Sequence, residues 1–138
     1  MKKVLLVVED KQEEILLAKT AVESFGCGAM YATNLVDAKR LLIQFEKNIF
    51  GVVTDLHYQS MKENDSDAQK PNGLALVALC VAKNIRVAVC SDINHHFSNY
   101  LVEPIRVLQT HQSYSFGKIP FSEDSKNWKE TIQKILNL

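Results

Sequence analysis

This sequence has no excess of charge of either sign, because 16 lysines and arginines balance 16 aspartates and glutamates. A protein without a strong positive field lacks the long-range attraction that draws proteins to nucleic acid or to an anionic membrane surface. No apolar run approaches the roughly 20 residues of a membrane-spanning helix, and the first ten residues lack the apolar core and cleavage site of a signal peptide. We therefore expect a cytoplasmic protein with neither nucleic acid nor a membrane as its partner.

Cysteine is also scarce. The three cysteines, Cys27, Cys80 and Cys90, are odd in number and stand in apolar surroundings. None belongs to a CxxC pair or to the Cys and His spacing of a zinc site. We interpret them as small core residues in a reducing compartment, which excludes a disulfide framework.

What the chain does have is apolar content, since 46% of its 138 residues are hydrophobic. A chain of this length and composition buries an adequate core without disulfides or structural metals. We expect one domain that covers residues 1–138.

Short apolar runs alternate with helical patterns along the whole chain. Runs rich in valine, leucine and isoleucine predict strands, and apolar residues spaced three and four apart predict helices. The expected strands cover residues 3–8, 28–32, 50–55, 85–92 and 113–118. The expected helices cover residues 11–26, 35–45, 71–84, about 94–109 and 125–138, and Pro104 must either start a new turn or kink the fourth of them.

Strands that alternate with helices predict an α/β fold with a parallel sheet. For five strands we expect a doubly wound sheet of the flavodoxin-like order 2-1-3-4-5, with helices on both faces. Ligands in such folds bind beyond the carboxyl ends of the strands, where the strand order reverses. That point lies between the first strand and the third.

Three carboxylates are predicted to meet there. Glu9 and Asp10 end the first strand, and Asp55 ends the third. Such close carboxylates repel one another, and a hard divalent cation with oxygen ligands relieves the repulsion. We therefore predict a Mg²⁺ site.

The neighbouring strand ends add a hydroxyl and an ammonium. Ser91 ends the fourth strand, and Lys118 ends the fifth. Together with the metal, these groups suit phosphoryl transfer, which depends on positioning and on stabilisation of charge. Asp55 can act as the nucleophile, as carboxylates do in aspartyl-phosphate chemistry.

At this stage the chain resembles the receiver domains of response regulators, particularly the stand-alone chemotaxis-type regulators. The matching segments are VLLVVED at residues 4–10, GVVTD at 51–55, PNG at 71–73, VAVCS at 87–91 and GKIPF at 117–121. No single segment is specific, but their order at successive strand ends is, and the match covers nearly the whole chain.

The resemblance implies a function and a set of roles. Asp55 is the expected phosphoacceptor. A histidine kinase or a phosphotransfer protein is expected to donate the phosphoryl group to it. The backbone carbonyl of His57 is expected to join the carboxylates in binding Mg²⁺, while Ser91 and Lys118 contact the phosphoryl group. A downstream protein is expected at the surface formed by the fourth helix, the fifth strand and the fifth helix.

The chain also departs from the family pattern. A polar loop at residues 57–72 is far longer than usual, and we hypothesise that it is mobile and gates access to Asp55. Asp92 follows the hydroxyl residue and adds negative charge beside an incoming phosphoryl group. Ile119 separates Lys118 from Pro120, whereas the family has lysine directly before proline.

Two classes of function remain open. The first is a phosphorylation switch, a signalling protein rather than an enzyme. Because the last helix ends at Leu138, we expect it to act through another protein, or the chain to be a fragment of a longer one. The second is a pseudo-receiver, a protein-binding module that works without phosphorylation. A third possibility, a Mg²⁺-dependent phosphatase-like enzyme, lacks a second acid two positions beyond Asp55, where His57 stands. Taken alone, the acid pair Glu9 and Asp10 has a simpler explanation as a cap for the next helix.

Overall fold

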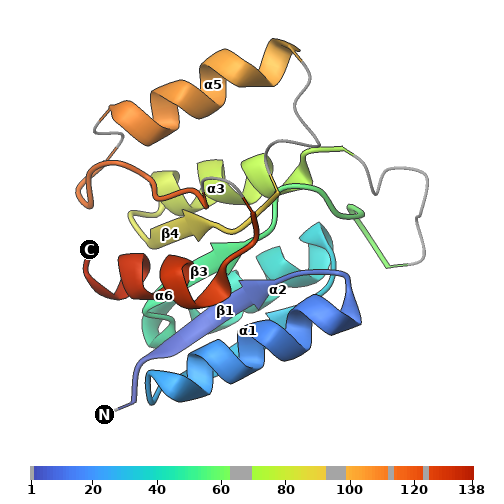
Figure 1. The fold of residues 1–138 in the computed structure, drawn as a ribbon, viewed down its shortest axis with the longest axis vertical. Helices are drawn as coiled ribbons and strands as arrows, with labels where there is room; N and C mark the ends of the chain where they lie inside the picture. Colours follow the sequence, from blue (N-terminus) through green and yellow to red (C-terminus); the bar gives the residue numbers. More distant parts are fainter. Residues whose placement is uncertain (1, 63–69, 93–98, 112–113, 123–124) are drawn as a thin grey trace.

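The structure is a computed structural model that describes residues 2–62, 70–92, 99–111, 114–122 and 125–138. It is a parallel sheet with helices on both faces (Figure 1). The strands are β1 (Val4–Val8), β2 (Gly28–Ala32), β3 (Gly51–Thr54) and β4 (Arg86–Val89). The helices are α1 (Gln12–Ser24), α2 (Leu35–Phe45), α3 (Asn72–Ala82), α5 (Asn99–Thr110) and α6 (Trp128–Leu136), and a short 3-10 helix, η1 (Glu46–Asn48), follows α2. Among the described residues, no helix combines the length and apolar character needed to cross a membrane.

The strand order is β2-β1-β3-β4. It confirms the expected α/β fold and the reversal between the first and third strands. Register places Val8, the last residue of β1, beside Ala32 of β2 and Thr54 of β3. The carboxyl ends of these three strands therefore lie level at one edge of the sheet.

The fifth strand is a correction, because in the described part of the chain the sheet has four strands and residues 114–118 do not form a fifth; residue 113 lies outside that part. Tyr114 pairs with Gly117 in a tight turn, and Gly117 has a φ of 86°, which glycine adopts at low cost. Only Phe121 makes a parallel bridge to β4, through Val89. Ile119 donates its N–H to Leu108 of α5, and Pro120 has no N–H to give, so a regular ladder cannot form.

The hydroxyl of Tyr114 accepts one of the hydrogen bonds that a fifth strand would have accepted from β4. The N–H of Val87, on the edge strand β4, donates to the hydroxyl of Tyr114 at 3.0 Å. The next outward N–H, that of Val89, donates to the carbonyl of Pro120 at 2.8 Å. These bonds satisfy edge donors that would otherwise attract another strand.

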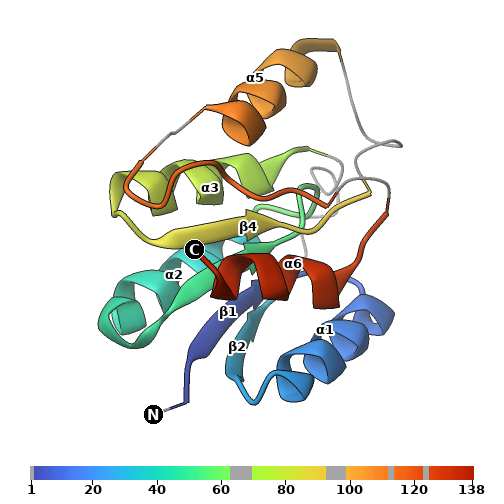
Figure 2. The same cartoon turned by 60° about the vertical axis from the view of Figure 1, so that its left-hand side comes forward.

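Two cores lie on the two faces of the sheet. Alternate residues of β1 point to opposite sides, as the period of a strand requires. Leu5 and Val7 pack with Trp128 and Ile132 of α6 and with α1, whereas Leu6 and Val8 belong to the core under α2 and α3. Figure 2 shows α1 and α6 on one side of the sheet and α2 and α3 on the other. Strands β1, β3 and β4 are covered on both faces, which explains their uninterrupted apolar runs, whereas most of the edge strand β2 is half-buried.

Helix α5 continues through Pro104 without ending there. It confirms the fourth expected helix from Asn99 to Thr110; the expected start near residue 94 falls on residues 93–98, which lie outside the described part. Figures 1 and 2 both show α5 beyond α3, on the side away from the rest of the sheet. Among the α5 side chains that the structure describes, Ile105 is buried in the core and Leu108 is partly buried against it.

The segment after β3 differs from the mobile polar loop that its composition predicted. His57 and Tyr58 are buried, and the Tyr58 hydroxyl lies 2.9 Å from Oγ1 of Thr54. The carbonyls of Gln59 and Ser60 accept the first N–H groups of α2. The start of the loop is therefore packed, because it satisfies a helix end that water would otherwise have to satisfy. Residues 63–69 lie outside the described part, and the gating hypothesis remains a prediction.

Candidate functional site

Three carboxylates meet at the carboxyl edge of the sheet. Glu9 follows β1 and Asp55 follows β3, and both are buried, while Asp10 is half-buried. One carboxylate oxygen from each of the three lies within 4.8 Å of the others. The structure thus brings together the three acids predicted from the sequence.

Backbone pairing beyond the strand ends holds this geometry. The N–H of Glu9 donates to the carbonyl of Ala32 at 3.0 Å, and the N–H of Asp55 donates to the carbonyl of Val8 at 2.9 Å. The following N–H, that of Leu56, donates to Oδ1 of Asp55 at 2.7 Å. One oxygen of Asp55 is therefore held by the main chain, and Oδ2 faces the other charged groups.

The lysine at these carboxylates is Lys126. Its Nζ lies 2.9 Å from Oε1 of Glu9 and 3.0 Å from Oδ2 of Asp55. Only 13% of the Lys126 side chain is exposed, so the two ion pairs are shielded from water. The residue stands directly before Asn127, whose side chain caps the first turn of α6. The cap and the returning chain place it at the carboxyl edge.

Lys118, the lysine predicted for this site, lies elsewhere. It is exposed and lines a surface hollow with Gln109 and with Lys134 in the last turn of α6. The chain end that follows α6 contacts the start of β4, where Arg86 donates to the carbonyl of Leu138. Lys118 is thus near the amino edge of the sheet, and the ammonium of the site is reassigned to Lys126. The displaced fifth strand is the reason, because the chain reaches the carboxyl edge only after Phe121.

A sequence signal for Lys126 existed, although it was not used. A lysine directly before an asparagine N-cap, at the start of the last helix of an α/β fold, stands where the chain leaves the carboxyl edge of the sheet. The motif GKIPF drew the assignment to Lys118 because it is closer to the family pattern.

Burial sets the protonation of the acids. The pKa of Glu9 is raised to about 9, first by desolvation and then by the nearby Asp55 carboxylate, while the Lys126 ammonium opposes both effects. Desolvation and the charge of Asp55 also raise the pKa of Asp10. Desolvation lowers the pKa of Lys126, but the two carboxylates outweigh it and hold this pKa above its usual value. One ammonium therefore does not offset the burial and mutual repulsion of the acids, since the pKa values of Glu9 and Asp10 stay raised beside it.

The residues fit a hard divalent cation. Oε2 of Glu9 is buried and has no hydrogen-bond partner among the described residues, so it is available as a ligand. The site offers three carboxylates, and carboxylate oxygens are ligands that Mg²⁺ and Ca²⁺ prefer. His57 is buried two residues after Asp55, and coordination by its backbone carbonyl remains a prediction.

The hydroxyl predicted at this edge, that of Ser91, is buried next to β4. Its Oγ has no hydrogen-bond partner within the described ranges. Its main chain is tied to a residue that the sequence did not single out: the N–H of Ser91 donates to Oγ of Ser122 at 2.8 Å, and that hydroxyl donates back to the Ser91 carbonyl at 2.5 Å. Ser122 therefore fixes the main chain of Ser91 and leaves the side-chain hydroxyl available.

The PNG segment has a steric role behind Asp55. The N–H of Gly73 donates to the carbonyl of Leu56 at 2.9 Å. A Cβ at position 73 would overlap the carbonyl oxygen of Asp55 and lie 2.9 Å from Cα of Leu56. Only glycine permits this close approach, which brings the start of α3 against the main chain of Asp55 and Leu56.

Comparison with known proteins identifies the fold. The chain matches no protein-family model and no curated protein sequence. Among solved structures, a response regulator from Thermotoga maritima has 19% identity and a TM-score of 0.61, covering 100% of both chains. A response regulator receiver protein from Pseudomonas putida has 19% identity and a TM-score of 0.63, covering 99% of this chain and 97% of its own.

These similarities show a receiver-type fold over the full chain. The fold alone does not determine the activity, since a de novo designed Rossmann 2x3 protein also has a TM-score of 0.57, with 15% identity and coverage of 99% of this chain and 90% of its own. Function must therefore be argued from the site.

Proposed function

We propose that this protein is a receiver of two-component signalling that accepts a phosphoryl group on Asp55 in a Mg²⁺-dependent reaction. The observation that carries the proposal is the meeting of Glu9, Asp10 and Asp55 at the point of strand reversal, with Lys126 bonded to two of them. Receiver-type proteins of similar fold support it. The donor is a histidine kinase or a phosphotransfer protein, and the setting is the cytoplasm.

Asp55 is the nucleophile in this proposal. One of its carboxylate oxygens bonds to phosphorus while the bond from phosphorus to the donor's histidine nitrogen breaks, and the leaving imidazole keeps the electron pair. The main-chain N–H of Leu56, which holds Oδ1, keeps the carboxylate from rotating. Burial of Asp55 excludes most of the water that would compete for the same phosphorus.

The other residues balance charge. Glu9, Asp10, Asp55 and the carbonyl of His57 would hold Mg²⁺, which supplies positive charge against the phosphoryl oxygens when bound. Lys126 brings its ammonium to Asp55 through a buried ion pair and can neutralise charge that develops on the transferred group. The hydroxyl of Ser91, which has no hydrogen-bond partner among the described residues, would donate to a phosphoryl oxygen.

Intact mass spectrometry tests this proposal directly. The protein is incubated with Mg²⁺ and a small acyl-phosphate donor, beside Asp55→Asn. We expect one phosphoryl group to be added to the wild type and none to the variant or to protein in chelator. A folded wild type that gains no mass contradicts the proposal.

A second candidate is the pseudo-receiver, a binding module that needs no phosphorylation. The favouring observation is that Lys126 already bridges Glu9 and Asp55, so a cation must compete with a buried ammonium. Asp92, directly after Ser91, adds further negative charge near an incoming phosphoryl group. Partner binding that is equal in wild type and Asp55→Asn would favour this candidate.

We propose that the protein signals through a downstream protein, whether it is a phosphorylated receiver or a pseudo-receiver. The surface for it is formed by α5, the segment 114–122 and α6, which takes the place of the expected face with a fifth strand. Because this segment makes only one bridge to β4, its conformation is less constrained than that of a regular strand.

A further inference from the structure

Tyr58 carries a hydroxyl group into the core close to Asp55 in the chain. Its side chain is fully buried among the residues that pack under α2 and α3. A buried tyrosine hydroxyl usually has a hydrogen-bond partner, since an unsatisfied polar group in the core costs free energy. The partner here is Oγ1 of Thr54, the last residue of β3, at 2.9 Å. The loop after β3 is therefore bonded back to the strand that it leaves.

The hydrogen bond between Tyr58 and Thr54 has a defined direction. The Thr54 hydroxyl donates to the carbonyl oxygen of Asp55 at 2.8 Å. A hydroxyl has one hydrogen to donate, so the Tyr58 hydroxyl is the donor in its contact with Thr54. Both side chains are fully buried, which keeps water from replacing either bond. Two hydrogen bonds in series thus run from Tyr58 to the main chain of Asp55.

The peptide group between Asp55 and Leu56 connects these bonds to the candidate site. Its carbonyl oxygen accepts from Thr54, and its N–H donates to Oδ1 of Asp55 at 2.7 Å. A peptide group is planar, so its C=O and its N–H turn together. The bond that fixes the carbonyl therefore also fixes the N–H that holds the Asp55 carboxylate.

The main chain around Tyr58 is bonded to the start of α3. Nδ2 of Asn72 donates to the carbonyl of Tyr58 at 2.6 Å, and the N–H of Gly73 donates to the carbonyl of Leu56 at 2.9 Å. The predicted main-chain ligand, the carbonyl of His57, belongs to the residue between these two. Residues 56–58 are therefore held from two sides, by α3 through their carbonyls and by β3 through the tyrosine hydroxyl.

We propose that Tyr58 is a positioning residue of the cation site, which acts through Thr54 to orient the Asp55 carboxylate. This role rests on the proposed binding of Mg²⁺ by the three carboxylates, and it adds a determinant of the affinity of that site. A ligand group that is already oriented loses less conformational freedom when the cation binds, so the cation binds more tightly. The Tyr58 hydroxyl itself touches neither the cation nor a phosphoryl group in this role.

Isothermal titration calorimetry of the full chain with Mg²⁺, without phosphoryl donor, measures this affinity. Tyr58→Phe keeps the ring and removes only the hydroxyl. We expect this variant to bind Mg²⁺ with a dissociation constant about three- to tenfold higher than that of the wild type. The effect is smaller than for a group bonded directly to a metal ligand, because the hydroxyl acts through Thr54 and a peptide group.

Thr54→Val tests whether Thr54 transmits the effect. Valine has the shape of threonine without its hydroxyl, so this variant removes both hydrogen bonds at once. We expect its dissociation constant for Mg²⁺ to rise at least as much as that of Tyr58→Phe. The double variant should bind no more weakly than Thr54→Val alone, because the two residues act in series. Losses of affinity that add in the double variant contradict this route.

The orientation of the peptide group can be measured without metal. In chelator, we expect hydrogen exchange at the Leu56 N–H to be at least about tenfold faster in Tyr58→Phe than in the wild type. The change should be smaller at Val53, which lies inside β3. This difference separates a local loss of orientation from a general loss of stability.

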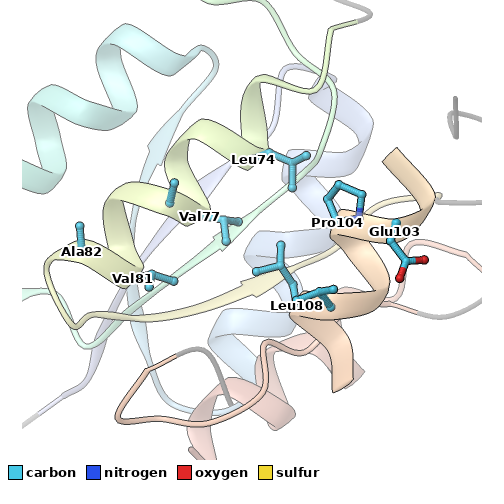
Figure 3. Close-up of a pocket in the computed structure, with 9 residues that line it drawn as sticks. Leu74, Val77, Val81, Ala82, Glu103, Pro104 and Leu108 are labelled. Atoms are coloured by element: carbon cyan, nitrogen blue, oxygen red, sulfur yellow. The ribbon is translucent and has the colours of Figure 1, made fainter. Parts of the chain in front are cut away.

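The control for a general loss of packing is Val81→Ala, near the last turn of α3. Figure 3 shows Val81 in the apolar groove between α3 and α5. This variant should be less stable than the wild type and should bind Mg²⁺ with the same affinity. If it weakens Mg²⁺ binding as much as Tyr58→Phe does, the effect is one of stability and the positioning role is overturned.

Two further outcomes distinguish this role from the proposed function on which it rests. A Tyr58→Phe variant that binds Mg²⁺ as the wild type does, or that leaves exchange at the Leu56 N–H unchanged, overturns the role of Tyr58 alone. A folded wild type that binds no Mg²⁺ overturns the proposed Mg²⁺-dependent function together with this role.

Discussion

The ammonium of Lys126 lies 3.0 Å from Oδ2 of Asp55, although the two residues are 71 positions apart in the chain. The same ammonium also pairs with Glu9, so it is the main positive charge beside the three acids. Its removal leaves buried carboxylates without their partner, which is costly both for stability and for any reaction that gathers negative charge there.

We predict that Lys126→Ala lowers the rate of phosphoryl uptake from an acyl phosphate at least about tenfold, because a charge-stabilising group is lost at the acceptor. The matched control is Lys118→Ala, which should react like the wild type. A time course of intact mass at saturating Mg²⁺ measures both. If Lys118→Ala were the slow variant, the reassignment of the lysine would be wrong.

The second prediction concerns Glu9 and pH. Its pKa rises from 4.5 to about 9 on folding, chiefly through desolvation. Its contribution to stability is therefore fully present below about pH 4.5 and is lost as pH rises toward 9, since the unfolded chain releases the proton earlier. Without metal, we expect Glu9→Gln to be more stable than the wild type at pH 8 by about 1 to 2 kcal/mol, with a flatter pH profile.

Urea unfolding in chelator between pH 5 and pH 8.5 measures this effect. The exposed Glu13→Gln serves as control and should follow the wild type. Added Mg²⁺ should stabilise the wild type and have much less effect on Glu9→Gln, because one ligand is gone. Equal slopes of stability against pH in Glu9→Gln and the wild type would contradict the assigned burial of this carboxyl group.

The third prediction concerns the close approach at Gly73. Alanine there overlaps the carbonyl oxygen of Asp55, a backbone atom that cannot move without shifting the acceptor. We expect Gly73→Ala to cost about 1 to 3 kcal/mol of unfolding free energy and to slow phosphoryl uptake. Gly28→Ala is the control, since its new methyl would make only ordinary contacts at 3.5 and 3.6 Å. Equal stability of the two variants would show that the start of α3 does not pack so closely against the main chain of Asp55 and Leu56.

The fourth prediction concerns the buried thiols. Desolvation raises the pKa of Cys80 to about 12 and that of Cys90 to about 12. The thiolate is the reactive form, so both thiols should resist a disulfide reagent at pH 8 in the native protein and react fully in denaturant. Mass mapping of the labelled cysteines after a short pulse distinguishes them. Rapid native labelling of Cys80 or Cys90 would mean that this part of the core opens readily.

The same shifts affect stability in alkali. Because unfolded thiols lose their protons near pH 9 and the buried ones do not, the unfolded state is favoured progressively as pH rises above 9. Cys80→Ala and Cys90→Ala should each reduce this loss of stability with pH, even though the cavity that they leave lowers stability at neutral pH.

Local pattern was enough to predict most elements. The apolar runs of β1, β3 and β4 have no polar face because helices cover both sides of the sheet, so their sequence alone identified them as buried strands. The order of strands then placed Glu9 and Asp55 at one crevice without any knowledge of their contacts. These conclusions depend on periodicity and on general rules of parallel sheets.

Other features depend on competition between distant groups. The sequence SYSFGK has a strand-like composition, but the Ile119 N–H donates to α5 and the Val87 N–H donates to Tyr114, so the ladder that would have carried Lys118 to the site does not form. The start of the polar segment after β3, through Gln59 and Ser60, is likewise packed because it caps α2, a partner more than 20 positions earlier in the chain.

By itself, then, the sequence determined the α/β fold and the meeting of three acids, because side-chain periodicity and strand order are local or topological properties. Only the tertiary structure decided which lysine neutralises those acids. Because the chain pairs with the end of β4 only at Phe121, it reaches the carboxyl edge of the sheet after Lys118. Lys126 rather than Lys118 therefore contacts Asp55.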